Sequence, residues 1–211
     1  MRGKDIKRYS YNFSDKYLIT TYNEYTDDRG VLHPSIDMKD YPAIKEYLDS
    51  YWNAISKRQD KGDTPYNLRR CAYMDDFNRP KLIWKVIGNQ MAFALDKSKF
   101  LLNNACYILT GDYLEYLTVM LNSDAIMWYS FITNMNQTGV GDVQVGKQNI
   151  ILLPIPFNQQ HIQKLTEQFK SYISNEININ EFEKITFDSV ADIFDFSIEE
   201  QNFIRNFKNS L

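Results

Sequence analysis

The chain has 211 residues, which is enough for one large domain or for one domain with an appendage. Its composition is ordinary for a globular protein, with 44% hydrophobic and 24% charged residues, and no apolar run approaches the length of a membrane span. Cys71 and Cys106 form no C-x-x-C pattern and indicate buried thiols in a reducing cytoplasm, while His33 and His161 lie too far apart in sequence for a metal-ligand motif.

The net charge of −3 conceals an asymmetry between the two halves of the chain. Residues 1–100 hold 18 Lys+Arg against 14 Asp+Glu, whereas residues 101–211 hold 6 against 13. A basic half joined to an acidic half indicates a polyanion-binding face on the first and a solvated or protein-facing surface on the second. The alternative, that both are ordinary solvated faces, fits the charges equally well.

The first part of the chain is predicted to contain one short strand and one clear helix. Residues 17–21 have the pattern of a strand. Pro42 suits a first helical turn, and apolar side chains then recur on one stripe, which predicts a helix over residues 42–55. Gly62 is expected to close this segment in a left-handed conformation.

A small sheet is predicted next. Apolar runs indicate strands over residues 82–87, 91–95 and 105–109. Gly88-Asn89 is a suitable turn for a hairpin between the first two strands.

Two helices and a further strand follow the predicted sheet. One helix is expected over residues 113–122, and Asp124 is expected to cap another that runs to about residue 134. The apolar run at residues 150–153 is closed by Pro154, which favours a short buried strand.

After Pro156 the pattern becomes helical and no strand is evident. Apolar residues recur at helical spacing from Ile162 onward, and Ser197 and Glu200 form a Ser-x-x-Glu capping box before a last helix. We therefore predict an α+β protein, with a mixed α/β domain at residues 1–156 and a small helical, acidic C-terminal tail at residues 157–211.

The stretch "GDVQVGKQ", residues 141–148, is one residue away from the phosphate-binding loop G-x-x-x-x-G-K-[ST]. Gln148 stands where the magnesium-binding hydroxyl belongs. Such a loop follows a strand and opens a helix, but here the preceding segment is polar and the following one is predicted to be a strand. We therefore interpret the stretch as a flexible loop that binds no nucleotide.

No catalytic constellation is evident in the sequence. Neither histidine lies in a nucleophile–base motif. Asp75 and Asp76 could hold magnesium as nuclease carboxylates do, but the further acid and lysine of such a site cannot be assembled, and solvated turn acids are the simpler interpretation. The Asn-Pro-Pro-Tyr motif of amino-methyltransferases is also absent. We expect a chain without a catalytic or metal site of its own.

Several segments, in order, carry a resemblance to one family: "RGKDIKRY", "YPAIKEYLDSYWNAISKR", "LRRCAYMDDFNRPKLIWKVIG", and "NNACYILTGDYLEYLTVMLNSDAIMWY" followed by "GVGDVQVGKQNIILLPIP". Together they resemble the TaqI-like C-terminal specificity domain, the target recognition domain of restriction–modification methyltransferases. They are also similar to the recognition domains of type I specificity subunits. The tail resembles the short helical ending that follows such domains in large combined restriction–methylation enzymes.

The resemblance implies that methyl transfer and DNA recognition are carried out by separate domains. A separate methyltransferase domain, on the same or a neighbouring polypeptide, would bind S-adenosylmethionine and flip the target base, while this chain grips double-stranded DNA and reads base edges. The parent protein would be a type II restriction enzyme or adenine-specific DNA methyltransferase that uses S-adenosylmethionine and magnesium. This chain would need no cofactor, would act in the cytoplasm away from membranes, and would be an excised domain or a truncated gene product.

The residues expected to contact DNA are cations, amides and one tyrosine in the basic half and the glycine loop. They are Arg2, Lys4, Lys7, Arg8, Tyr9, Arg69, Arg70, Lys85, Asn89, Gln144, Lys147 and Gln148. Two other functions stay open. The acidic tail, apolar on one face, could make the chain a protein-interaction module, and Asp75 with Asp76 could make it a magnesium nuclease.

Overall fold

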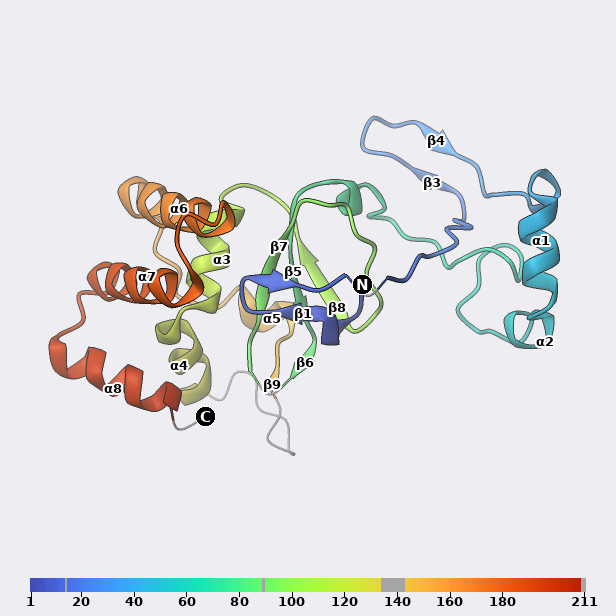
Figure 1. The fold of residues 1–211 in the computed structure, drawn as a ribbon. Helices are drawn as coiled ribbons and strands as arrows, with labels where there is room; N and C mark the ends of the chain where they lie inside the picture. The colour runs from blue at the N-terminus through green and yellow to red at the C-terminus, as the bar shows by residue number, and fades with distance from the viewer. Residues whose placement is uncertain (14, 89, 134–142, 210–211) are drawn as a thin grey trace. The chain divides into compact units, whose positions relative to one another are not determined.

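The computed structural model describes residues 1–13, 15–88, 90–133 and 143–209, and it has the predicted α+β fold (Figure 1). The chain divides into two compact units. The main unit comprises Met1–Asp15 and Pro80–Leu211, and the inserted unit comprises Lys16–Arg79. The boundary that we predicted at residues 156/157 does not coincide with the limits of these units, and it stays a prediction from sequence.

A three-stranded antiparallel sheet in the order β7-β5-β8 forms the centre of the main unit. Its strands are β5 (Lys81–Lys85), β7 (Phe93–Asp96) and β8 (Cys106–Leu109), which confirms the three predicted strands. Leu82 of β5 is fully buried, because strands lie on both sides of it and helices cover the sheet.

Two short ribbons accompany this sheet. The N-terminal segment forms η1 (Gly3–Asp5) and a hairpin of β1 (Ile6–Lys7) with β2 (Ser10–Tyr11). The end of the first predicted strand separates as β6 (Ile87–Gly88), which pairs with β9 (Val143–Gln144).

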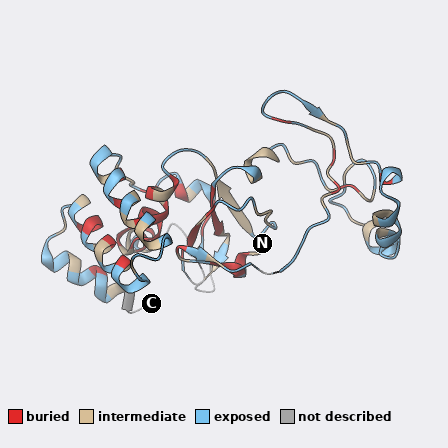
Figure 2. Ribbon diagram, turned by 45° about the horizontal axis from the view of Figure 1, so that its top comes forward, coloured by how far each residue is buried: buried red, intermediate tan, exposed pale blue. Residues whose placement is uncertain are grey.

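Helices that precede and follow β9 in the sequence build the larger core of the main unit. They are α3 (Leu114–Asn122), α4 (Asp124–Ile132), α6 (Gln159–Ile173), α7 (Ile179–Ile193) and α8 (Ile198–Asn209). The helix α3 packs against α6, and α6 packs against α7 (Figure 1). Buried residues recur along the tail helices between exposed ones (Figure 2), as expected for amphipathic helices that cover a core.

The N-terminal hairpin and the tail share this core. Tyr9 is 6% exposed and lies in one apolar cluster with Leu165 of α6 and Phe182 of α7. The rings of Tyr9 and Phe182 meet edge to face at 5.0 Å between centroids. The helical tail is therefore packed into the main unit and completes its core.

A buried ion pair lies at one end of the β5–β7 ladder, where Lys81 and Asp96 are register partners. Lys81 Nζ lies 2.8 Å from Asp96 Oδ2, and both side chains are fully buried. The carboxylate also accepts hydrogen bonds from the backbone N–H groups of Ser98 and Phe100 and from the Tyr11 hydroxyl. These bonds compensate for part of the cost of removing two charges from water.

The inserted unit contains one hairpin and several short helices. The hairpin pairs β3 (Tyr25–Thr26) with β4 (Leu32–His33). The helices are η2 (Met38–Asp40), α1 (Pro42–Asp49), α2 (Trp52–Ile55) and η3 (Asp75–Asn78).

Polar side chains hold the inserted unit together. Asn67 is 1% exposed and donates from Nδ2 to the carbonyls of Tyr22 and Ile36. Asn23, also buried, accepts from the Asp63 backbone N–H at 2.9 Å. Among the described residues of this unit, Met38 is the only buried apolar side chain, so hydrogen bonds outweigh apolar burial in its interior.

Three predictions for the first part of the chain need correction. Residues 17–21 form no strand in the described structure. The helix predicted over residues 42–55 is interrupted after Asp49 and resumes at Trp52, although Pro42 does begin it. Gly62 is not left-handed; it lies so close to Leu68 and Asn23 that a Cβ would fall 2.5 Å from the Leu68 carbonyl oxygen.

Two predictions for the second part also need correction. The N-cap of α4 is Ser123, whose hydroxyl accepts from Ile126 N–H, and Asp124 is the first helical residue. The run at residues 150–153 is not a strand, because α5 (Lys147–Ile150) is helical and a turn follows it. The capping box of Ser197 and Glu200 before α8 is confirmed by reciprocal hydrogen bonds.

Candidate nucleic-acid interface

The β6–β9 ribbon brings together predicted DNA contacts that are far apart in sequence. Ile87 is the register partner of Gln144, and Val145 N–H donates to the Val86 carbonyl at 2.9 Å. The indole of Trp84 donates to the Val145 carbonyl at 2.9 Å, which anchors the ribbon to the sheet. Lys85 is the last residue of β5. It therefore lies two residues before Ile87 of β6, which pairs with Gln144.

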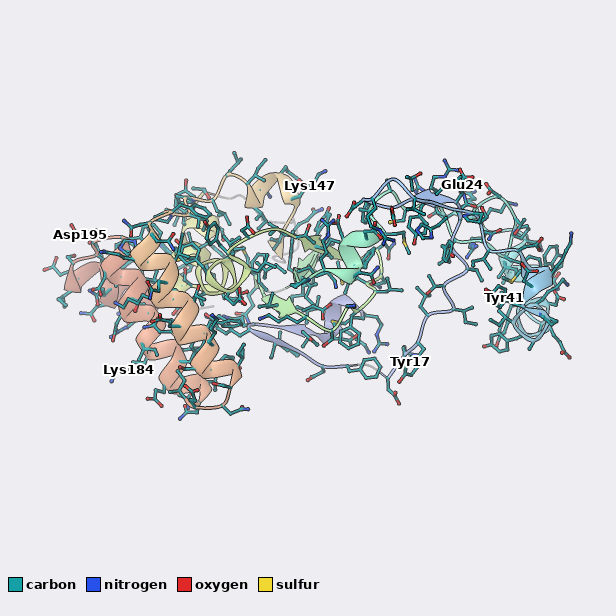
Figure 3. The ribbon with its side chains drawn as sticks, turned by 90° about the horizontal axis from the view of Figure 1, so that it is seen from above. Tyr17, Glu24, Tyr41, Lys147, Lys184 and Asp195 are labelled. Carbon is teal, nitrogen blue, oxygen red and sulfur yellow. The ribbon has the colours of Figure 1, made fainter. Side chains whose placement is uncertain are left out.

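The start of α5 continues this region. Lys147 is exposed at the first residue of α5 (Figure 3), and Gln148 is exposed beside it. Gln144 is exposed as well. Asn89, the remaining predicted contact in this region, lies outside the described residues.

An open cleft of about 600 Å³ lies beside the ribbon. Three predicted DNA contacts, Arg2, Lys4 and Lys85, line it, although the last is more than 80 residues from the others in sequence. The other lining residues are Gly3, Val86, Ile87, Asn103, Asn104 and Ala105. The structure thus brings three cationic side chains to one cleft, and such side chains are common phosphate contacts.

Asn103 and Asn104 were not among the predicted contacts. Both are exposed and occupy the loop before β8. The Asn103 side-chain oxygen accepts from Ala105 N–H at 3.3 Å, so its amide nitrogen is a donor for other groups. An Asn-Asn pair next to a strand is a weak signal in sequence, because it is equally typical of an ordinary turn.

Arg2 of the cleft is paired with a carboxylate near it in the chain. Its guanidinium donates to both carboxylate oxygens of Asp5 at 3.2 Å, and its backbone N–H donates to Asp5 Oδ2 at 2.8 Å. Since Asp5 is buried, this pair is a fixed part of η1. The charge of Arg2 in the cleft is therefore compensated by Asp5.

Two predicted contacts lie inside the protein. Arg8 has a side chain that is 16% exposed; it contacts Glu183 at 3.0 Å and Asp124 at 3.3 Å, and it donates to the Asn122 carbonyl at 2.8 Å. The neighbouring Tyr9 is a core residue, and burial raises the pKa of its phenol above the ordinary value. Neither side chain is available to DNA in this fold, whereas Lys7, which precedes them in the chain, is exposed.

Arg69 and Arg70 belong to the inserted unit and are exposed. Arg69 pairs with Asp60 at 3.3 Å, and Arg70 pairs with Glu24 at 3.2 Å. Ion pairs this exposed are weak in water, so both guanidinium groups can exchange these partners for an anionic ligand.

The residues that resemble a phosphate-binding loop have a different local structure from the one we predicted. A helix does begin at Lys147, so the expectation of a strand after the loop was wrong. That helix has only four residues, and Val143 to Val145 are engaged in the ribbon with β6. Gly141 lies outside the described residues, and the absence of nucleotide binding stays a prediction.

The acidic residues considered for catalysis are engaged in local contacts. Asp75 accepts from the backbone N–H of Asp28 at 2.8 Å, and Asp76 pairs with Arg79 at 3.6 Å. Hydrogen bonds from the side chain of Arg29 and from Val31 N–H hold the pKa of Asp27 well below its usual range. Within the described ranges, no three His, Cys, Asp or Glu side chains form a group that could hold a metal ion.

The two thiols are free and half-buried, whereas the sequence indicated buried thiols. Burial raises the pKa of Cys106 to about 11, which keeps this thiol protonated and a poor nucleophile at neutral pH.

The family model of the TaqI-like C-terminal specificity domain matches residues 1–155. The chain belongs to this family. The matched range includes the cleft, the ribbon and the whole inserted unit, and it ends one residue before the predicted boundary at residue 156. The family implies DNA binding and DNA sequence specificity in restriction–modification systems, and a specificity domain of this kind is typically non-catalytic.

Among curated proteins, none matches the chain. None of the helices in the described part of the chain is both long and apolar enough to cross a membrane.

Proposed function

We propose that this chain is the target recognition part of a restriction–modification enzyme, and that it holds duplex DNA for a separate methyltransferase domain. The observation that carries this proposal is the cleft where Arg2, Lys4 and Lys85 converge, within the segment that the family model matches. Phosphate contacts at the cleft would fix the position of the duplex, and exposed arginine and amide groups would read base edges.

The chemistry of the complete enzyme belongs to another domain in this proposal. The parent protein is a type II restriction enzyme or adenine-specific DNA methyltransferase, with S-adenosylmethionine as methyl donor and magnesium for cleavage. This chain only binds the duplex and reads base edges. The hydrogen-bonded inserted unit supports a role in readout, because it presents Arg69 and Arg70 at its surface.

One observation weighs against the alternative of a protein-interaction module that docks through its tail. That alternative needs an apolar face on the tail helices. Ile162, Leu165 and Phe169 of α6 form such a face, and all three are buried in the core shared with α3 and Tyr9.

A domain exchange tests the proposal. Joined to its methyltransferase domain, the chain should direct methylation to a defined DNA site. Replacing residues 1–156 by those of a relative with another site should transfer the relative's site, while exchange of the tail alone should leave the site unchanged. An unaltered site after the first exchange would contradict the assignment of sequence recognition to this chain.

A further inference from the structure

The turn that follows α5 exposes two adjacent aliphatic side chains. Ile151 is 79% exposed and Leu152 is 66% exposed. Among the described residues of the segment that the family model matches, these are the two most exposed aliphatic side chains. A single exposed hydrophobic residue is common on protein surfaces. Two that are consecutive and this exposed form an apolar projection that a ligand can cover.

The projection is held in place by its neighbours in the chain. Ile150 and Leu153 are buried in the same apolar cluster as Trp84 of the central sheet. Within the turn, the backbone N–H of Leu152 donates to the Asn149 carbonyl at 3.1 Å. The exposed pair is therefore presented by an anchored turn, so its insertion into a ligand would need no folding of a loop.

The polar side chains beside the projection suit a polyanion. The backbone N–H of Ile151 donates to the Lys147 carbonyl at 3.3 Å, so these residues lie one helical turn apart. Gln148 precedes Leu152 by the same four residues, and both Lys147 and Gln148 are exposed. Residues 143–166 contain no Asp or Glu. A cation and an amide next to apolar side chains are groups that contact phosphates and base edges.

We propose that Ile151 and Leu152 form an apolar wedge that inserts between base pairs of the bound duplex, with Lys147 at a neighbouring phosphate. Aliphatic side chains that enter a base step unstack it and kink the duplex. This inference rests on the proposed function and specifies how the chain would act on DNA. An unstacked step lowers the cost of extruding a base, which the methyltransferase domain requires.

Three variants separate the wedge from the charge beside it. Ile151→Ala combined with Leu152→Ala removes the wedge and keeps every charge, whereas Lys147→Ala removes the charge and keeps the wedge. Ile198→Ala is the matched control, because Ile198 of α8 is 70% exposed and lies outside the segment that the family model matches. All of these positions are exposed, so the fold should be retained, which thermal denaturation verifies.

The experiment measures binding of the full chain by fluorescence anisotropy to two labelled duplexes of the same mixed sequence, over a series of chloride concentrations beginning at low salt. One duplex is fully paired and the other has a single central abasic position, where the stack is already weakened. The wild type should bind the abasic duplex about tenfold more tightly, because less unstacking is needed there.

The variants should divide these effects between them. The double alanine variant should bind the two duplexes about equally and keep the wild-type slope of log affinity against log salt, because it loses no phosphate contact. Lys147→Ala should retain the preference for the abasic duplex and lower the slope by about 0.9. Ile198→Ala should behave as the wild type does.

Other outcomes separate the failure of this inference from the failure of the proposed function. Salt-dependent binding by the wild type without a preference for the abasic duplex, or a preference that survives in the double alanine variant, would overturn the wedge and leave DNA recognition standing. A wild-type dimer in sedimentation that is absent in the double variant would assign the pair to an interface between two copies of this chain. A wild type that binds neither duplex at low salt would overturn both proposals together.

Discussion

Asn122 of α3 exchanges two hydrogen bonds with the backbone of Phe93 in β7. Its Oδ1 accepts from Phe93 N–H at 3.0 Å, and its Nδ2 donates to the Phe93 carbonyl at 2.8 Å. The side chain is 3% exposed, so a single amide serves as a strand partner at the edge of the central sheet and ties that sheet to the helices.

Asn122→Leu should therefore lower the free energy of unfolding by about 1–3 kcal/mol, because it leaves the buried backbone N–H of Phe93 without its partner, while the Phe93 carbonyl keeps only the hydrogen bond from Tyr9 N–H. Denaturation in urea measures this change. Asn202→Ala, at an exposed position of α8, is the control and should change stability by less than about 0.5 kcal/mol. Equal effects of the two substitutions would show that the bonds to Phe93 contribute nothing.

Arg8→Ala should act on stability, whereas Lys7→Ala should not. Removing the Arg8 guanidinium leaves Glu183 and Asp124 without their shared partner at a largely buried position, and we expect a loss of about 1–3 kcal/mol. Lys7 is exposed and its replacement should cost less than about 0.5 kcal/mol. Thermal denaturation of the two variants tests this, and a stable Arg8→Ala protein with weakened DNA binding would instead restore Arg8 as a DNA contact.

The buried pair of Lys81 and Asp96 should be much more sensitive to the loss of one partner than to the loss of both. Asp96→Asn leaves a buried ammonium without its counter-charge, which should cost about 3–5 kcal/mol. In Lys81→Met/Asp96→Asn the uncompensated charge is gone, so the loss should be smaller than in Asp96→Asn alone. Strictly additive losses in a double-mutant cycle would mean that the two side chains are not coupled.

Phosphate contacts and base contacts should be distinguishable by their sequence dependence. Lys4→Ala combined with Lys7→Ala should weaken binding to all duplexes about equally and reduce the salt slope by up to roughly two units, one for each lost contact. If Arg69, Arg70 or Gln144 reads a base edge, its replacement should cost about 1–3 kcal/mol on the preferred site and little elsewhere. Competition between specific and mixed-sequence duplexes measures the difference, and uniform effects of all these substitutions would exclude readout by the three residues.

The chain alone should neither methylate nor cut DNA. With S-adenosylmethionine, magnesium and duplex DNA present, we expect no product, because Asp75 and Asp76 are engaged in local contacts. Cleavage that is reproducible and disappears in Asp75→Asn would support the nuclease instead.

The strands of the central sheet could be predicted because mainly apolar runs such as residues 82–87, where Lys85 is the one polar residue, leave few alternatives. The prediction of a strand at residues 150–153 was wrong for a physical reason. Ile150 and Leu153 are buried, while Ile151 and Leu152 are 79% and 66% exposed, which is the spacing of a helical turn and not of a strand. Four residues are too few for this period to be recognised in the sequence.

The candidate site could be predicted only in part. A cluster of cations at residues 2–8 indicates an anion site, but the sequence cannot show that Arg8 meets Glu183, a partner 175 residues away. The position of Lys85 beside Arg2 and Lys4 likewise depends on the contact of η1 with β5, two segments that local patterns do not connect.

The packing of Tyr9 against Phe182 also bears on the order of events during synthesis. The ribosome completes the N-terminal hairpin first, but the surface on which Tyr9 rests is supplied by helices from the last quarter of the chain. Until α7 has left the exit tunnel, Tyr9 lacks the ring of Phe182 against which it packs. The core of the main unit is therefore completed only after α7 has been synthesised, and the inserted unit, whose contacts lie within residues 16–79, can fold well before it.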